Sequence, residues 1–193
     1  MYFDSEFRRV GLIDPKPLAE VIASFGEDAW FEYGRRQETF QAHLHTQTIP
    51  LVYDEDMRHR EPTVWPRFTE IEPVLQPALE LIRAANPSTG GGYFVRIIVT
   101  RLSPGARISR HRDYGDSLLR SHRNHLAIST NEQVEFEIDT KVQHFAAGEI
   151  WEINNRKYHS VRNRGKDARI HMILDYVATG ETIQDPDEGL LVA

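Results

Sequence analysis

The residues of this chain that are best suited to chemistry are His111, Asp113, His159 and Arg169. Two histidines and one carboxylate can bind a metal from one side and leave its other coordination positions open. This ligand set is typical of non-haem Fe(II) oxygenases rather than of structural zinc sites. A guanidinium such as that of Arg169 can hold a carboxylate through two parallel hydrogen bonds. We therefore expect an iron site next to an anchor for a dicarboxylic cosubstrate whose other end chelates the metal.

The spacing of these residues fits a single site. His111 and Asp113 are two residues apart, so in extended chain both side chains point to the same face. His159 opens a later predicted strand, which can lie beside the one that carries His111. Arg169 lies in a predicted central strand, where an arginine that faces the interior needs an anion. By itself, an H-x-D pair is more often a surface ion pair, because three-residue patterns recur by chance. The prediction therefore depends on the residues around it.

Polar residues near His111 and Asp113 strengthen the prediction of a metal site. Arg123 and His125 share one face of a predicted strand just after the pair, and Thr100 lies on the strand that leads into it. His171 shares a strand face with Arg169. Each has a simpler interpretation: Arg123 as a surface cation, Thr100 as a residue that favours strands, and His171 as a satisfied core histidine. For His171 the simpler interpretation is the favoured one.

The second half of the chain has the texture of a β-protein. Short stretches rich in β-branched and aromatic residues are separated by turn signals, which favours a sandwich or barrel. A double-sheet jelly roll is such a fold, and cupin-type sites lie inside it. The predicted strands are residues 93–102, 125–130, 134–138, 149–153, 159–162 and 169–177, with a strand-like piece at 48–52.

Two helices are predicted before this β-region. The first covers residues 15–26, and Asp14 can cap it. The second covers residues 70–85, where apolar side chains recur at helical spacing and Thr69 can serve as the N-cap. We therefore expect a mainly β fold, with a jelly-roll, cupin-like core supported by N-terminal helices.

Composition limits the function further. The chain has 193 residues, a size that suits one domain, and a net charge of −6 from 23 basic and 29 acidic side chains. Non-specific binding to nucleic acid is not expected, because the phosphate backbone demands clustered cations. No apolar run is long enough to span a bilayer, and no signal peptide is visible. Cysteine is absent, so a metal has only the nine histidines and the carboxylates as ligands. We expect a cytoplasmic protein with neither a membrane nor a nucleic-acid partner.

From about residue 93 to residue 176, the chain resembles the aspartyl/asparaginyl β-hydroxylase family of Fe(II)- and 2-oxoglutarate-dependent oxygenases, which includes bacterial proline hydroxylases. The order and spacing of several short motifs carry the resemblance. In chain order they are Ser103-Pro104-Gly105, His111-Arg112-Asp113, Arg123-Asn124-His125-Leu126, residues 148–155, residues 159–163 and Arg169-Ile170-His171.

The resemblance implies a double-stranded β-helix in which the two histidines and the aspartate described above bind Fe(II). It implies that Arg169 and Thr100 bind the far carboxylate of 2-oxoglutarate, and that Arg123 and His125 lie near its 1-carboxylate end. Dioxygen would then oxidise 2-oxoglutarate to succinate and carbon dioxide while the substrate gains a hydroxyl group on an unactivated carbon.

The resemblance also narrows the substrate. Animal members of the family that modify folded domains lack the ligand carboxylate, whereas this chain has Asp113. We expect a small carboxylate-bearing substrate, namely a free or carrier-bound amino acid of the Asp, Asn or Pro type. A non-enzymatic cupin-like binding protein and an oxygenase of protein residues remain open. We expect one oxygenase domain over 1–193, with a specificity-determining N-terminal support (1–90), the jelly-roll core with both sites (91–180) and a tail (181–193).

Two further groups of charged or metal-binding residues have weaker interpretations. A basic run is interpreted either as a solvated loop or as a funnel for anions, in which Arg107 and Arg110 pair with the substrate carboxylate. It comprises Arg107, Arg110, Arg112, Arg120 and Arg123. The His43-Leu44-His45 stretch, followed by Asp54 and Asp56, is a less favoured metal site, since spacing places no third ligand. The segment with Arg35, Arg36, His43 and His45 is instead expected to close over the substrate amine.

Overall fold

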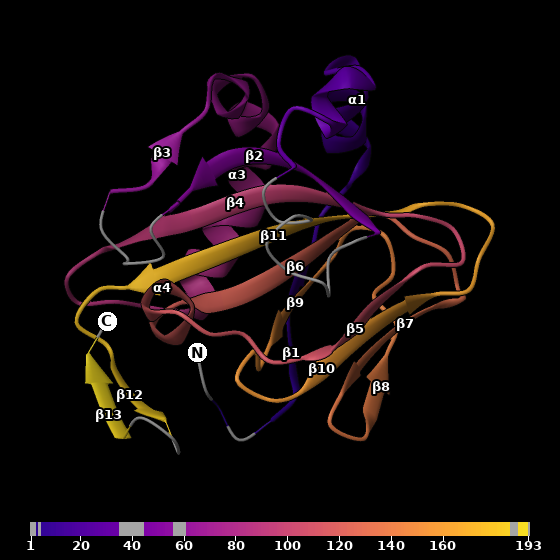
Figure 1. The fold of residues 1–193 in the computed structure, drawn as a ribbon. Helices are drawn as coiled ribbons and strands as arrows, with labels where there is room; N and C mark the ends of the chain where they lie inside the picture. Colours follow the sequence, from indigo (N-terminus) through magenta and orange to yellow (C-terminus); the bar gives the residue numbers. More distant parts are fainter. Residues whose placement is uncertain (1–2, 4, 35–44, 56–60, 186–188, 193) are drawn as a thin grey trace.

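The fold is known from a computed structural model, which describes residues 3, 5–34, 45–55, 61–185 and 189–192 (Figure 1). Its helices are α1 (Lys16–Ser24), the 3-10 helix η1 (Asp28–Trp30), α3 (Pro66–Ala85) and α4 (Asp116–Arg120). Its strands are β1 (Phe7–Leu12), β2 (Thr46–Tyr53), β3 (Thr63–Val64), β4 (Gly92–Leu102), β5 (Arg107–His111), β6 (His122–Ser129), β7 (Val134–Ile138), β8 (Lys141–Gln143), β9 (Glu149–Ile153), β10 (His159–Asn163), β11 (Arg169–Ala178), β12 (Thr182–Asp185) and β13 (Gly189–Val192).

Two antiparallel sheets face each other, as a jelly roll requires. The large sheet has seven strands in the order β1-β9-β6-β11-β4-β2-β3, and the small sheet has four in the order β5-β10-β7-β8. Apolar side chains from both sheets form one shared cluster, with Leu102 and Ala127 from the large sheet and Phe136 and Val161 from the small one. Strands β12 and β13 form a separate hairpin. The prediction of a mainly β, jelly-roll fold is confirmed.

The large sheet has two chemically different faces, because successive side chains of a strand point to opposite sides. On β11, Met172 and Leu174 belong to the apolar cluster that includes the buried side chains of α1 and α3. The alternating residues Arg169 and Ile173 line a pocket on the other face, toward the small sheet. Figure 1 shows α1 and α3 on one side of the central strands and the small sheet at the lower right. The second face therefore lies inside the jelly roll.

The helices bury apolar stripes against the large sheet. In α3 the buried residues fall at helical spacing: Ile71, Leu75, Ala78, Leu79 and Ile82. This helix begins at Pro66, earlier than predicted, because proline suits the first turn of a helix. Thr69 is therefore inside the helix and not its N-cap; its hydroxyl donates to the carbonyl of Pro66 at 2.7 Å. The first predicted helix is confirmed as α1, and the carboxylate of Asp14 accepts the Lys16 amide at 3.0 Å.

Several strands were not predicted. Strand β1 is one of them, whereas the strand-like piece predicted at 48–52 is confirmed within β2. Both strands belong to the large sheet, so the N-terminal region is more than a helical support. Strand β5 contains Arg107 and Arg110 of the basic run, for which a solvated loop was one of the two interpretations. Its arginines obscure the pattern, since only Ile108 is buried within a strand that is otherwise exposed or half-buried. The hairpin of β12 and β13 lies in the stretch that was predicted to be a tail.

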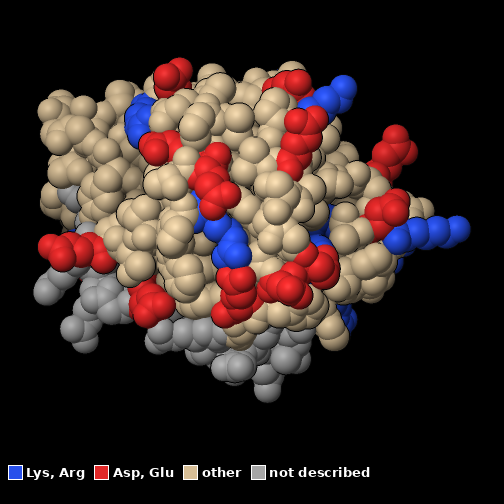
Figure 2. Space-filling view, turned by 90° about the horizontal axis from the view of Figure 1, so that it is seen from above, with Lys and Arg blue, Asp and Glu red and all other residues tan. Residues whose placement is uncertain are grey.

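The face seen in Figure 2 carries scattered acidic and basic side chains, and its described residues form no extended basic area. Of the helices in the described ranges, none combines the length and the apolar composition needed to cross a lipid bilayer.

Candidate active site

The two histidines and the aspartate meet at one point. Strands β5 and β10 pair so that His111 lies opposite His159. Asp113 follows β5, and its amide donates to the carbonyl of Asn155 at 3.0 Å. The Nε2 atoms of His111 and His159 lie 3.8 Å and 3.9 Å from the carboxylate oxygens of Asp113. One ligand atom from each residue lies within 4.8 Å of the others, so the three can hold one ion. The predicted convergence is confirmed.

Both histidines present the correct ring nitrogen. Nδ1 of His111 lies 2.7 Å from the carbonyl of Ser109, and Nδ1 of His159 lies 3.0 Å from that of Lys157. A carbonyl accepts only, so Nδ1 carries the proton and the lone pair is on Nε2, which faces the cluster. Burial lowers the pKa of His159 to about 4, although the charge of Asp113 acts in the opposite direction. The ring is therefore neutral near pH 7, as metal binding requires.

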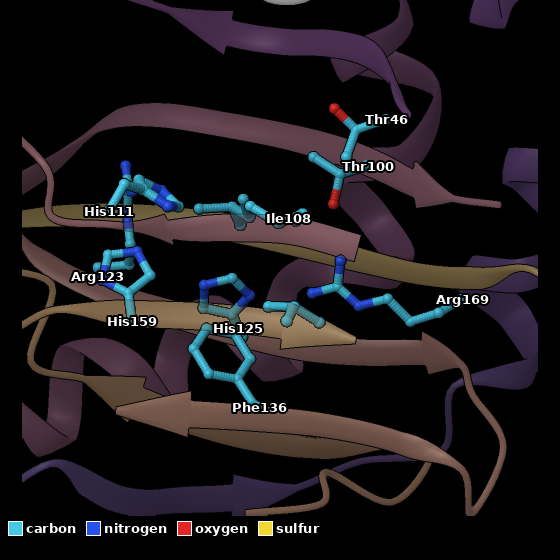
Figure 3. Close-up of a pocket in the computed structure, with 11 residues that line it drawn as sticks. Thr46, Thr100, Ile108, His111, Arg123, His125, Phe136, His159 and Arg169 are labelled. Atoms are coloured by element: carbon cyan, nitrogen blue, oxygen red, sulfur yellow. The ribbon is translucent and has the colours of Figure 1, made fainter. Parts of the chain in front are cut away.

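A pocket that is partly open to solvent extends from this cluster between the two sheets. Its lining residues are Thr46, Thr100, Ile108, His111, Arg123, His125, Phe136, His159, Val161, Arg169 and Ile173. Figure 3 shows His111 and His159 at one end and Arg169 with Thr100 at the other, with His125 in between. The structure thus brings all the predicted site residues except Asp113 to the lining of one pocket, and Asp113 lies within the cluster at its end.

The Arg169 end is built by three neighbouring strands. Arg169 on β11 is 1% exposed, and its Nη2 lies 2.8 Å from Nδ1 of His171. Burial, and next the charge of Arg169, keep the pKa of His171 well below its usual value, so His171 is neutral and Nδ1 accepts. Thr100 on β4 lies opposite His171 on β11, and its hydroxyl donates to the backbone carbonyl of His171 at 3.2 Å. His171 is thus a buried partner of Arg169 through Nδ1, but it is not the fully satisfied core histidine that was favoured, because its buried Nε2 has no hydrogen-bond partner among the described residues.

Arg123 is not a surface cation. It is 5% exposed, and its guanidinium contacts Asp113 on one side and Asp175 on the other. Burial would lower its pKa, but the two carboxylates raise that pKa above the usual value, so the charge is permanent. Arg123 therefore touches a predicted metal ligand directly, in addition to lining the pocket. Asp175 was missed from the sequence, because a lone aspartate in an apolar strand carries no spacing signal.

Other pocket residues were also missed. Thr46 on β2 lies opposite Leu102 on β4, and Leu102 in turn lies opposite Arg169 on β11. Strand register alone therefore brings Thr46 to the Arg169 end of the pocket. Phe136 packs edge-on against His125, with ring centroids 5.1 Å apart. Phe136 lies on a strand in which apolar and polar residues alternate. That pattern predicts a buried side chain, but it does not distinguish a pocket residue from a residue of the hydrophobic core.

The remaining basic residues lie elsewhere. Arg107 and Arg110 line a groove on the small sheet with Glu135, Glu137 and Arg162, and neither lines the pocket described above. Arg110 stacks on Tyr158 at 4.7 Å, and Arg112 on Tyr114 at 4.9 Å. Arg120 is in α4 and pairs with Asp116. The assignment of Arg107 and Arg110 to a substrate carboxylate therefore has no geometric support.

The second histidine pair is only partly within the described residues. Arg35, Arg36, His43 and Asp56 lie outside them, so the lid prediction stays a prediction. His45 is exposed, and Asp54 is buried against Arg96 at 2.7 Å. Within the described part of the chain, the one group with metal-ligand geometry is that of His111, Asp113 and His159.

Known proteins resemble the chain in fold and in part of the sequence. L-proline cis-4-hydroxylase of Rhizobium meliloti is 32% identical over 81 residues, which cover 42% of this chain and 29% of that protein. A Trichoplax adhaerens prolyl hydroxylase in complex with a hypoxia-inducible-factor peptide has a TM-score of 0.63 at 14% identity, over 91% of this chain and 84% of its own. A viral collagen prolyl hydroxylase of Paramecium Bursaria Chlorella virus-1 has a TM-score of 0.59 at 10% identity, over 91% and 97%. At such low identities, the two structures indicate the fold alone.

The decisive comparison is with a family. The sequence model described as Aspartyl/Asparaginyl beta-hydroxylase matches residues 74–179, which is more than half of the chain. The matched range runs from within α3 to the end of β11 and includes all three residues of the metal cluster as well as Arg169. The chain belongs to the aspartyl/asparaginyl β-hydroxylase family.

Proposed function

We propose that this chain is an Fe(II)- and 2-oxoglutarate-dependent hydroxylase of a small carboxylate-bearing substrate. The observation that carries the proposal is a single pocket with a two-histidine, one-carboxylate cluster at one end and a buried arginine at the other. Each end alone has other uses. Together they match a cosubstrate that binds a metal through one end and an arginine through its distal carboxylate.

The donor set fits Fe(II). Two neutral imidazole nitrogens and one carboxylate oxygen, all on one side, leave coordination positions open for other ligands. His111 and His159 would bind the ion through Nε2, and Asp113 through one carboxylate oxygen while the other accepts from Arg123. When bound, iron supplies the oxidising chemistry with dioxygen that no protein side chain can perform. The part of the protein is to hold the ligands, orient the reactants and exclude water.

The rest of the pocket fits 2-oxoglutarate. The Arg169 guanidinium can grip a carboxylate through two hydrogen bonds, and the hydroxyls of Thr100 and Thr46 lie at the same end (Figure 3). Between the two ends, burial and next the charges of Arg169 and Arg123 keep the pKa of His125 well below its usual value, so its ring is neutral. Apolar walls complete the pocket, formed by Ile108, Phe136, Val161 and Ile173. Such walls limit water and strengthen the polar contacts inside.

For the substrate we propose a free or carrier-bound amino acid. The relative from Rhizobium meliloti is named for hydroxylation of L-proline, and it is 32% identical to this chain over 81 residues. The alignment covers less than a third of that protein, so proline itself is only one member of the proposed class.

The test is turnover with a panel of amino acids. Purified protein is incubated with Fe(II), ascorbate, 2-oxoglutarate and each amino acid, both free and as a thioester. Succinate is quantified, and mass spectrometry looks for the gain of one oxygen. We expect succinate and product to rise together with one or a few substrates, and the His111→Ala variant to form neither.

Other outcomes separate the alternatives. Succinate that couples only to a peptide or a folded protein would replace the small substrate by a protein residue. Absence of succinate under every condition, with a metal bound, would favour a cupin-like binding protein and end the hydroxylase proposal.

A further inference from the structure

A row of alternating buried charges starts at the metal cluster and crosses the large sheet. Arg123 on β6 contacts Asp113 through Nη1 and binds Asp175 on β11 through two nitrogens, Nε at 2.8 Å and Nη2 at 2.7 Å. Arg96 on β4 lies 3.8 Å from Asp175 through Nη1 and binds Asp54 at 2.7 Å through Nη2. The order is thus acid, base, acid, base, acid.

Strand register enforces this row. Arg123 and Arg96 are the partners of Asp175 on its two sides, so three neighbouring strands present the central charges at one level. The five side chains are buried: Asp113 is 9% exposed, Arg123 5%, Asp175 0%, Arg96 3% and Asp54 2%. Buried charges at such a site are costly unless they are paired. The pairing is therefore part of how this end of the pocket is built.

The sum of the charges has a consequence for a cation. Arg123 alone would neutralise Asp113 and remove the one negative charge among the three metal ligands. Asp175 engages two of the three nitrogens of Arg123 and offsets its charge. Asp54 likewise offsets the charge of Arg96. Without Asp54, the charge of Arg96 would be offset by Asp175 instead. Three carboxylates and two guanidinium groups give the row one net negative charge.

We infer that Asp175 is a positioning residue of the metal site, which aims Arg123 at Asp113 and offsets its charge so that Asp113 stays an anionic ligand. Asp54 supports Asp175 from the far side of Arg96. This inference rests on the metal site of the proposed function and extends it to two residues that do not touch the ion. The effect travels through one guanidinium and must weaken from Asp175 to Asp54.

The first experiment measures metal affinity without turnover. Calorimetric titration of metal-free protein with Mn²⁺ compares the wild type with Asp175→Asn, which keeps the shape and removes the charge. We expect affinity to fall by about 10–100-fold, the range typical of residues that support metal ligands. Asp54→Asn should give a smaller loss. Glu152→Gln is the matched control: Glu152 is 1% exposed and pairs with His122 and Arg8, outside the row, so its metal affinity should stay that of the wild type.

A double variant separates an electrostatic role from a merely structural one. Adding Arg123→Met to Asp175→Asn removes the guanidinium that the single variant leaves uncompensated. We expect metal affinity to recover relative to Asp175→Asn, so that the two substitutions are strongly non-additive. A double variant that binds Mn²⁺ no better than Asp175→Asn would overturn the charge-offset role.

The remaining outcomes are also decisive. Wild-type protein that binds Mn²⁺ while Asp175→Asn binds equally well would overturn this inference and leave the proposed function intact. Wild-type protein that binds no divalent ion would overturn both. If Asp175→Asn does not fold, Asp54→Asn takes its place, and an affinity equal to that of Glu152→Gln would overturn the inference.

Discussion

The two faces of the large sheet are made by the same strands and differ in chemical character and in role. The face toward α1 and α3 is apolar over most of β4, β6 and β11, with Val99, Leu126, Met172 and Leu174 fully buried; His122 and Asn124 at the start of β6 are the polar exceptions. The face toward the small sheet carries charged and polar groups at alternating positions of those strands. They include Arg96, Thr100, Arg123, His125, Arg169, His171 and Asp175.

This difference shows where stability and function are located. Burial of apolar side chains stabilises the fold by roughly 1.5–3 kcal/mol for each large side chain. Buried charges add little net stability, and removing one partner of a pair is costly. One residue step along a strand therefore moves from a position that holds the fold together to one that serves the pocket. Substitutions at neighbouring residues should separate the two roles.

The largest effect is expected on the pocket face, at the metal cluster. Asp113→Ala removes the only anionic ligand, so Mn²⁺ affinity should fall by more than the roughly 100-fold limit typical of supporting residues. Calorimetric titration measures the affinity. The control is Asp116→Ala, an exposed carboxylate on α4, which should bind as the wild type does. A metal affinity that survives in Asp113→Ala would remove this residue from the ligand set.

The next effect is expected on the helix face. Leu174 is fully buried in the apolar cluster and is adjacent to Asp175 in sequence. Leu174→Ala should lower the free energy of unfolding by about 2–5 kcal/mol, through lost burial and the cavity left behind. Denaturant unfolding measures this, and Mn²⁺ affinity of the folded variant should not change. If Leu174→Ala weakened metal binding as much as Asp175→Asn, the separation of the two faces would be wrong.

A third effect concerns the far end of the pocket. Arg169→Ala forfeits two charge-assisted hydrogen bonds to the cosubstrate, and affinity for 2-oxoglutarate should fall at least about 100-fold, or about 2.7 kcal/mol. Titration of Mn²⁺-loaded protein with 2-oxoglutarate measures it. Arg162→Ala, an exposed arginine on β10, is the control. Unchanged 2-oxoglutarate binding in Arg169→Ala would contradict the proposed orientation of the cosubstrate.

The smallest effect is a pH dependence of the metal-free protein. The pKa values of buried His125 and His171 lie well below 6.5, so the unfolded chain takes up protons first as the pH falls. Stability should be full above about pH 6.5 and decline below it, by up to about 1.4 kcal/mol per pH unit for each histidine. Unfolding at pH 7 and pH 5 tests this, and His171→Phe should show a shallower decline. An unchanged slope in His171→Phe would mean that His171 titrates normally.

The metal cluster could be predicted because local chemistry and spacing define it. His111 and Asp113 need only extended chain between them, and the pairing of β5 with β10 supplies His159. Arg169 was identifiable because a guanidinium among apolar residues needs a reason. These signals are carried by residue type and by separations of two residues.

What could not be predicted depends on strand order and register. Asp175 reaches Arg123 because β11 lies next to β6, and Thr46 reaches the pocket because β4 lies between β11 and β2. Nothing in the local sequence states that order. Strand β5 was missed because its solvent-facing arginines break the apolar pattern. The start of α3 was missed because Thr69, which suggested an N-cap, lies inside a helix that begins at Pro66.

The carbonyls that orient the two histidine ligands have a consequence for sequence variation. Each belongs to the residue two positions earlier, Ser109 for His111 and Lys157 for His159. Because every residue type has a backbone carbonyl, no particular side chain is needed at positions 109 and 157 to fix the tautomer of the ligand. Substitutions at these two positions should therefore leave the orientation of the histidine ligands unchanged, even though the positions flank the metal site. Only a change in the local backbone path, such as an inserted or deleted residue, would disturb it.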